Sequence, residues 1–384
     1  QGNLMPAGSM IKIQSGGTLY LNQALTFAPS FELYGGGNTE GLGALRIEGG
    51  GTVTGNVTLF GNSAIGGNGS VNTISGTISQ SGGTYGFSKV GNGTLSLTGS
   101  NTYGGATNLN GGTISVGGTS PLGTGSLVMA NGTTLSAASP ATVSNAITVN
   151  GASTLSAASG ALTLNGNITG SPTGSMTLNS NNKLTLGGTN NLTLSGNFAG
   201  FIINAGTGGV DITGSTTING NAANQQSGYC NVAGNVTVTV KSGASFAFNG
   251  TTNATWPGSI IGQNAAGTSN LVVDGGNLSI GANTGIAFGN NIATAIGVLS
   301  VNSGIATITA GSTTSTDTRS FVSLGRDVAT GTINLNGGTL ETSRRFIRDG
   351  SGTADISGAA NFVFNGGKLK ALANQTDWLN SATI

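Results

Sequence analysis

Short strings with an apolar residue at every second position recur along this chain, each closed by Gly, Asn, Ser or Thr. They are GALRIEGG (43–50), GTLSLTG (93–99), ALTLNGN (161–167), KLTLGG (183–188), LTLSGN (192–197), VDITGS (210–215), NVTVTVKSG (235–243) and GTINLNGG (331–338). Alternation with period two puts Leu95 and Leu97 on one face of a strand and Ser96 on the other. Successive strings begin roughly 8–12 residues apart, a spacing typical of an all-β sandwich, barrel or solenoid.

The turns between these strings favour the solenoid. Asn-Gly-Gly or Asp-Gly-Gly triplets begin at Asn110, Asp274, Asn336 and Asn365, and each triplet ends two residues before an apolar strand residue. Because Asn-Gly and Gly-Gly reach positive φ at little cost, we expect one corner geometry to be reused. The 384 residues also exceed the ~100 of a typical sandwich, and self-similarity at a short period indicates stacked repeats. The chain is therefore predicted to be all-β, an elongated parallel β-helix with short protruding loops.

Charge is distributed unevenly along this predicted helix. Thirteen of the 23 formal charges lie between Asp317 and Asp377. We therefore expect residues 1–316 to form the body, and residues 317–384 to form charge-richer C-terminal coils or a cap, continuous with it. The strand pattern lapses at 221–234 and around Trp256, which we interpret as loops that protrude from the body.

The composition indicates a folded chain. Glycine accounts for 71 residues and charged residues for only 6%, against about 25% in ordinary proteins. Hydrophobic residues nevertheless reach 36% with a mean hydropathy of +0.12, which leaves enough apolar surface to bury. Stacked coils would bring like positions within ~4.8 Å, a spacing that Thr, Ser and Asn ladders tolerate and Lys or Glu ladders do not.

Several partners are disfavoured by the same numbers. A net charge of +1 gives no electrostatic footprint for nucleic acid or an anionic membrane, and no apolar run approaches the ~18 residues of a membrane span.

Since the chain starts at Gln1, we expect an extracellular protein after signal-peptide removal, with an excised fragment as the alternative. Cys230 has no intrachain partner; we expect a buried hydrophobe, with an intermolecular bridge as the alternative.

The search for catalytic chemistry finds little. Glycoside hydrolysis needs two carboxylates about 5–9.5 Å apart. Glu32, Glu40 and Glu48 share an eight-residue spacing, but we interpret them as solvated turn residues. The C-terminal acids sit among arginines, so ion pairs are favoured over a lyase site built on Arg326 or Arg345. With no histidine and one cysteine the usual zinc sites are excluded, and we predict no catalytic residue, cofactor or metal.

Aromatic residues are sparse and mostly follow the strand pattern. We expect a core position for each that falls in or beside a string: Tyr20, Phe60, Tyr103, Phe201, Phe246 and Phe248.

One segment resembles a known repeat. GTLSLTG (93–99), NTY (101–103), Gly105 and GTI (112–114) resemble the autotransporter-associated β-strand repeat of bacterial surface-protein passenger regions, placed here near 91–118. The run with LGRD (324–327), NGGTL (336–340) and NGG (365–367) looks like the ends of large bacterial proteins that carry this repeat. The resemblance implies export, a right-handed β-helix and a fibrous or adhesive surface role, and it carries no catalytic residue.

The leading hypothesis is a non-enzymatic extracellular structural protein, the subunit of a bacterial cell-surface fibre, sheath or matrix. A β-helical adhesin that binds cell-surface glycans or host surfaces is the alternative, and a polysaccharide-degrading β-helix enzyme is less favoured. Open β-helix ends present unpaired backbone groups, so we expect head-to-tail contacts between copies of the chain, against a monomer with covered ends. The candidate assembly contacts are Leu4, Met5, Met10, Ile11, Ile13, Arg344, Arg345, Arg348 and Trp378.

Overall fold

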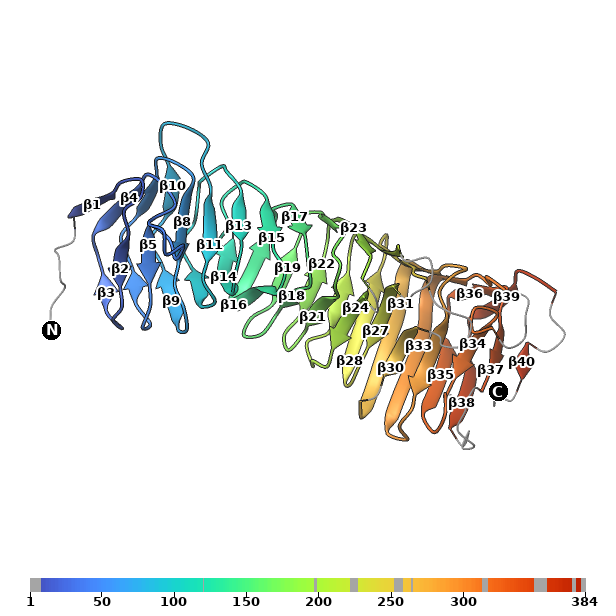
Figure 1. Ribbon diagram of the computed structural model, residues 1–384. Helices are drawn as coiled ribbons and strands as arrows, with labels where there is room; N and C mark the ends of the chain where they lie inside the picture. The colour runs from blue at the N-terminus through green and yellow to red at the C-terminus, as the bar shows by residue number, and fades with distance from the viewer. Residues whose placement is uncertain are drawn as a thin grey trace. The chain divides into compact units, whose positions relative to one another are not determined.

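The computed structural model describes residues 8–119, 121–196, 199–221, 227–251, 258–263, 265–312, 317–348, 358–374 and 378–380. These residues form strands, turns and bends and contain no helix. They divide into two compact units, Gln1–Thr169 and Gly170–Ile384. The strands of each unit pair in parallel with strands of the next coil, which is the arrangement of a β-helix (Figure 1). The all-β, parallel β-helix fold predicted from the alternating strings is confirmed. The predicted boundary at residues 316 and 317 stays a prediction.

The first unit winds through three stacks of parallel strands. One stack is β1 (Met10–Ile13), β4 (Ser30–Leu33), β7 (Val57–Leu59) and β10 (Ile78–Gln80). The second is β2 (Leu19–Leu21), β5 (Leu45–Ile47), β8 (Ser63–Gly66), β11 (Phe87–Val90), β13 (Thr107–Leu109), β15 (Leu127–Met129) and β17 (Ile147–Val149).

The third stack of the first unit is in regular register except for a shift between Val116 and Gly118. It holds β3 (Thr26–Phe27), β6 (Thr52–Val53), β9 (Val71–Ile74), β12 (Thr94–Leu97), β14 (Thr113–Thr119), β16 (Thr133–Val143) and β18 (Ser153–Ser156). The far end of β16 pairs with β19 (Leu162–Leu164), and β20 (Ile168–Gly170) lies at the boundary of the unit. The register matches Leu95 with Ile114, Ile114 with Leu135 and Leu135 with Leu155, so these coils take 19 to 21 residues, whereas the coil from Leu19 to Leu45 takes 26.

The second unit repeats the design with longer coils. Its first stack is β21 (Met176–Asn179), β24 (Ala199–Asn204), β27 (Ser227–Val232), β30 (Ser259–Gln263), β32 (Ile286–Asn290), β34 (Phe321–Leu324), β37 (Arg345–Ile347) and β40 (Leu379–Asn380). The second stack is β22 (Leu184–Leu186), β25 (Val210–Ile212), β28 (Val236–Lys241), β31 (Gly267–Ile280), β33 (Ala295–Ile308), β35 (Thr330–Leu335) and β38 (Ala359–Phe364). The third stack is β23 (Thr189–Leu194), β26 (Ser215–Gly220), β29 (Ser245–Asn249), β36 (Thr339–Thr342) and β39 (Lys368–Ala371).

The core of each unit is a set of apolar ladders. Leu95, Ile114, Leu135 and Leu155 are at most 2% exposed, because their period-two neighbours point outward. The aromatic residues expected in the core are there at Tyr103, Phe201, Phe246 and Phe248. The expectation was wrong for Tyr20, which is 45% exposed, and for Phe60, which is half-buried, because both face outward. Phe60 instead stacks on Tyr34 with ring centroids 4.9 Å apart.

Asparagine amides add ladders on the outside of the second unit. Asn219 donates to the side-chain oxygen of Asn191 at 2.9 Å, and Asn249 donates to that of Asn219 at 3.2 Å. Neutral amides tolerate this repeat across coils because each side chain both donates and accepts. This supports the sequence argument that stacked coils select uncharged polar residues.

Two expectations about the turns were wrong. The Asn-Gly-Gly corners do not share one geometry, since positive φ falls on the second glycine at Gly112 but on the first at Gly275 and Gly366. At Gly112 the coil beneath also requires glycine, because a Cβ there would lie 2.4 Å from the carbonyl oxygen of Gly93. Residues 221–234 are not all loop either: 227–232 form the buried strand β27. Residues 222–226 and Trp256 lie outside the described residues.

Candidate functional site

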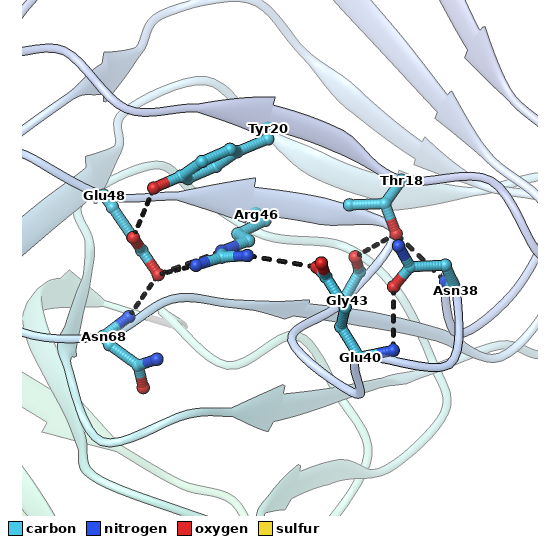
Figure 2. A network of polar contacts seen from close by, with 8 residues as sticks. All are labelled: Thr18, Tyr20, Asn38, Glu40, Gly43, Arg46, Glu48 and Asn68. Carbon is cyan, nitrogen blue, oxygen red and sulfur yellow. Dashed lines mark hydrogen bonds and ion pairs between the residues drawn. The ribbon is translucent and has the colours of Figure 1, made fainter.

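A polar cluster centred on Arg46 lies on the outer face of the first coils (Figure 2). Strand pairing places Tyr20 of β2 directly beside Arg46 of β5, and the guanidinium carbon lies 4.1 Å from the centre of the Tyr20 ring. Arg46 Nε and Nη2 lie 3.0 and 2.9 Å from Glu48 Oε1, and Nη1 lies 3.1 Å from Glu40 Oε2. One cation therefore joins two carboxylates and one aromatic ring.

Glu48 is held by further donors. The Tyr20 hydroxyl donates to Oε2 at 2.7 Å, and the backbone N–H of Asn68, in the following coil, donates to Oε1 at 3.0 Å. Burial raises the pKa of Glu48, but the bonds from Arg46, Tyr20 and Asn68 outweigh it, so the net pKa is lowered. The hydrogen bond to Glu48 raises the pKa of Tyr20 in turn.

Thr18 ties the neighbouring loop to this cluster. Its hydroxyl donates to the carbonyl of Gly43 at 3.0 Å and accepts the backbone N–H of Asn38 at 3.0 Å. The Asn38 side chain accepts the N–H of Glu40 at 3.1 Å, which holds Glu40 in reach of Arg46 (Figure 2). The cluster thus pins the loop at 36–43 to the sheet face.

The three N-terminal glutamates lie in two separate places. Glu40 and Glu48 converge on the same guanidinium, while Glu32 lies in another strand stack and bonds Lys12 at 3.0 Å and the Tyr34 hydroxyl at 2.8 Å. The interpretation as solvated turn residues was wrong for Glu32 and Glu48, whose side chains are only 13% and 15% exposed. Both sit on strand faces or edges where hydroxyl and cationic donors surround them.

A buried cation lies inside the first unit. Lys89 occupies an inward position on β11 in register with Ile65 and Leu109 and is 1% exposed. Its ammonium donates to the carbonyls of Val90 at 3.1 Å and Gly91 at 2.9 Å, and to that of Gly111, in the next coil, at 3.0 Å. Burial lowers the pKa of Lys89 to about 8. Sequence reasoning missed this residue because a lysine in a strand string is ordinarily exposed.

The second unit buries an arginine in the same way. Arg344 is 0% exposed, and its Nε and Nη2 donate to the carbonyls of Thr309 at 2.8 Å and Gly281 at 3.0 Å. Burial lowers its pKa to about 9, while the nearby Asp317 acts in the opposite direction. Asp317 is itself paired with Arg319 at 2.7 Å, and that bond holds the pKa of Asp317 down at about 2. Arg344 is thus an internal link between coils and is unsuited to the surface contact expected of it.

The other candidate assembly residues lie in different surroundings. Leu4 and Met5 fall outside the described residues. Met10 is 49% exposed, Ile13 is 5% exposed and Ile11 is half-buried. Ile11 lines an apolar cavity of about 100 Å³ at the first coil, whose walls are Ile11, Leu19, Leu21, Thr26, Phe27, Pro29 and Phe31. Arg345, Arg348 and Trp378 are half-buried.

Cys230 is a fully buried thiol on β27, in register with Phe201, and burial raises its pKa. In the part of the chain that the structure describes, no three His, Cys, Asp or Glu side chains group as they would around a metal ion. Within the same residues, no helix is long and apolar enough to cross a membrane.

Comparison with known families identifies one segment. Residues 87–116 match the family model described as the passenger-associated-transport-repeat. No curated protein and no solved structure matches the chain. The match runs from β11 through β12 and β13 into β14, and it includes Lys89 and its acceptor Gly111. The resemblance predicted from 91–118 is confirmed: the chain carries an autotransporter passenger-type repeat, built as coils of a parallel β-helix.

Proposed function

We propose that this chain is a non-enzymatic structural segment of a bacterial surface protein, exported and displayed outside the cell. The observation that carries the proposal is the passenger repeat itself, which forms part of the core. Phe87 and Tyr103 of the repeat pack edge to face at 5.5 Å, and Leu95 and Ile114 stack in register inside the helix. The repeat is associated with passenger transport, and its strands pair with those of the neighbouring coils. Because the repeat is part of the same fold, it supports export of the whole segment.

The way the charged residues of the first unit are used supports a structural role. Glu40 and Glu48 neutralise Arg46, Glu32 neutralises Lys12, and Lys89 is held by backbone carbonyls. Each of these groups ties a coil to its neighbour or a loop to the sheet. Such links stabilise stacked repeats, whose stability is the sum of each coil and its interfaces.

Surface display is tested on intact cells of the source bacterium. Antibody raised against the purified chain should label unpermeabilised cells, and protease added outside should remove the label. A cytoplasmic protein of the same cells serves as the control for lysis. Label that appears only after permeabilisation contradicts the proposal.

The finer proposal is a fibre, sheath or matrix built by head-to-tail contacts between copies of the chain. Two apolar surfaces support it. In the first unit, Ile11 and Leu21 line the cavity at the first coil. In the second unit, Val363 and Phe364 of β38 and Leu372 beside β39 are 44%, 47% and 43% exposed. Apolar groups of this size exposed at the rim of a sheet favour contact with another protein surface.

A further inference from the structure

One motif of the first unit repeats in both sequence and space. The tripeptides TLS (94–96), TIS (113–115), TLS (134–136) and TLS (154–156) each occupy the same place on successive strands β12, β14, β16 and β18. Strand pairing matches threonine with threonine and serine with serine at every step. We call the outward residues the Thr–Ser ladder: Thr94, Thr113, Thr134, Thr154, Ser96, Ser115, Ser136 and Ser156. β14 and β16 can be followed side by side in Figure 1.

The threonine hydroxyls of this ladder are partly open to solvent, whereas most of the serine hydroxyls lie at the bottom of the ladder. The four threonines are half-buried outward residues, and the serines lie deeper, with Ser96, Ser115 and Ser156 at 6–8% exposure. Over the residues that the structure describes, none of these eight hydroxyls has a hydrogen-bond partner, although other Ser and Thr hydroxyls of the unit do, such as Thr133. The ladder also lies in a charge-free stretch, since residues 90–182 contain no Asp, Glu, Lys or Arg.

The ladder forms a two-dimensional lattice with known spacings. Neighbouring strands lie about 4.8 Å apart, and the Thr and Ser of one strand, two residues apart, are separated by about 6.6 Å. In a tetrahedral water network with O···O distances of about 2.75 Å, two oxygens that share a neighbour lie about 4.5 Å apart. The axial repeat of hexagonal ice is eight-thirds of the O···O distance, or about 7.3 Å. The mismatch is about 0.3 Å per strand and about 0.7 Å along the strand.

We propose that the Thr–Ser ladder binds the surface of ice. A threonine column offers methyl groups that exclude liquid water and hydroxyls that occupy lattice positions. The deeper serine column would hold a row of waters that continues the same lattice between the strands. Both columns are branched or short side chains on a rigid sheet, so little conformational entropy is lost when water orders on them.

The chemistry of the ladder favours ice over a polysaccharide. Sugar sites combine aromatic platforms with directed polar groups such as amides and carboxylates. The ladder has only hydroxyl and methyl groups, and the aromatic rings nearest in sequence, Phe87 and Tyr103, are buried in the core. A charge-free stretch suits a neutral lattice, because a charged side chain holds its own hydration shell against freezing.

The test uses the purified full chain. Thermal hysteresis, ice shaping and inhibition of recrystallisation are measured for the wild type and for the T113K/T134K double variant. Its matched control is T148K, which changes another outward, half-buried threonine on β17 in a different strand stack. A T113V/T134V double variant keeps the branched shape and removes two hydroxyls, so it reports on the lattice even if the lysine variant folds poorly. Circular dichroism and thermal melting confirm that each variant is folded.

The proposal expects ice activity in the wild type and in T148K, loss of activity in T113K/T134K, and reduced activity in T113V/T134V. Wild-type protein without any ice activity overturns the proposal, as does equal loss in T148K. Binding to neutral polysaccharides such as cellulose or chitin, lost in T113K/T134K without any effect on ice, would assign the ladder to a glycan instead and also overturns it. The outcome is independent of whether the chain is displayed on cells.

Discussion

The ammonium of Lys89 lies 3.0 Å from the carbonyl oxygen of Gly111, so a side chain from one coil closes the corner of the next. The three acids of the first unit are engaged elsewhere, with Lys12 or Arg46, and backbone carbonyls accept the hydrogen bonds of this ammonium. An interior cation held by backbone carbonyls has two consequences. The desolvation of its charge opposes folding, and its long side chain forms a hydrogen bond that joins two coils.

The first prediction concerns the pH dependence of stability at Lys89. Its folded pKa of about 8 lies below the unfolded value of 10.5, so the unfolded chain binds more protons between these pH values. The contribution of Lys89 to stability should therefore rise between pH 8 and pH 10.5, by up to about 3 kcal/mol.

Urea unfolding of the wild type and of Lys89→Met at both pH values measures this contribution, because tyrosine titration is common to both proteins and cancels in the difference. The difference in unfolding free energy from the wild type should change more with pH for Lys89→Met than for the control Lys368→Met, which removes an exposed lysine. A constant difference for Lys89→Met would mean that the three carbonyl bonds fully compensate for burial.

The second prediction concerns the Arg46 cluster. Glu48→Gln removes the charge that meets Arg46 and Tyr20, and should lower the free energy of unfolding at pH 7 by about 1 kcal/mol. Because the folded pKa of Glu48 is lowered, its contribution is complete above pH 4.5 and is lost as the pH falls through the folded pKa. The variant should therefore lose part of the acid sensitivity of the wild type.

Glu40→Gln is the matched control for Glu48→Gln, since Glu40 meets the same guanidinium from an exposed loop, with its side chain 56% exposed. Its cost should stay below about 0.5 kcal/mol. Equal effects of the two substitutions in chemical denaturation would show that burial does not distinguish them.

The third prediction separates an internal role of Arg344 from an assembly role. Arg344→Met leaves the carbonyls of Thr309 and Gly281 without their donor and should destabilise the protein by about 1–3 kcal/mol. Arg344→Lys should recover only part of this, because one ammonium replaces two separate N–H donors. Thermal unfolding gives the stability and sedimentation gives the association state. Altered association with unchanged stability would instead indicate that Arg344 takes part in a surface contact between copies of the chain.

The fourth prediction tests head-to-tail contact at the first coil. Leu21→Lys places a charge in the wall of the apolar cavity and should abolish end-to-end association, while Gln23→Lys, at an exposed turn position nearby, should leave it intact. Electron microscopy and light scattering at high protein concentration measure the particles. Wild-type protein that stays monomeric would remove the basis of the assembly proposal.

Much of the fold is local information. Leu95 and Leu97 alternate with Ser96 whatever surrounds them, so the strand, its buried face and its solvent face could be predicted, and with repeated turns so could a β-helix. The passenger repeat was recognisable for the same reason, because its glycines and strands stand at fixed distances in the chain. These features depend on neighbours within a few residues.

The polar clusters were not predictable from the strand strings. Glu40 and Glu48 look alike in the sequence, yet one extends from a loop and the other lies under Tyr20 on the sheet face. Lys89 occupies the place of an apolar residue because the carbonyls of Val90 and Gly91, together with that of Gly111 in the next coil, surround its ammonium. The Gly111 carbonyl that meets Lys89 and the Asn68 N–H that meets Glu48 come from 22 and 20 residues away, so alternation along one strand carries no information about them.

The sequence by itself determined the class of protein: period-two strands, neutral polar faces and glycine corners leave few folds besides a stacked β-helix. The tertiary structure alone decided register, because coils of 19, 21 and 20 residues bring Thr94, Thr113, Thr134 and Thr154 into one column only if each corner absorbs a different length. The physical reason is that strand formation depends on local alternation, whereas register depends on backbone hydrogen bonds between coils and on the space each corner leaves.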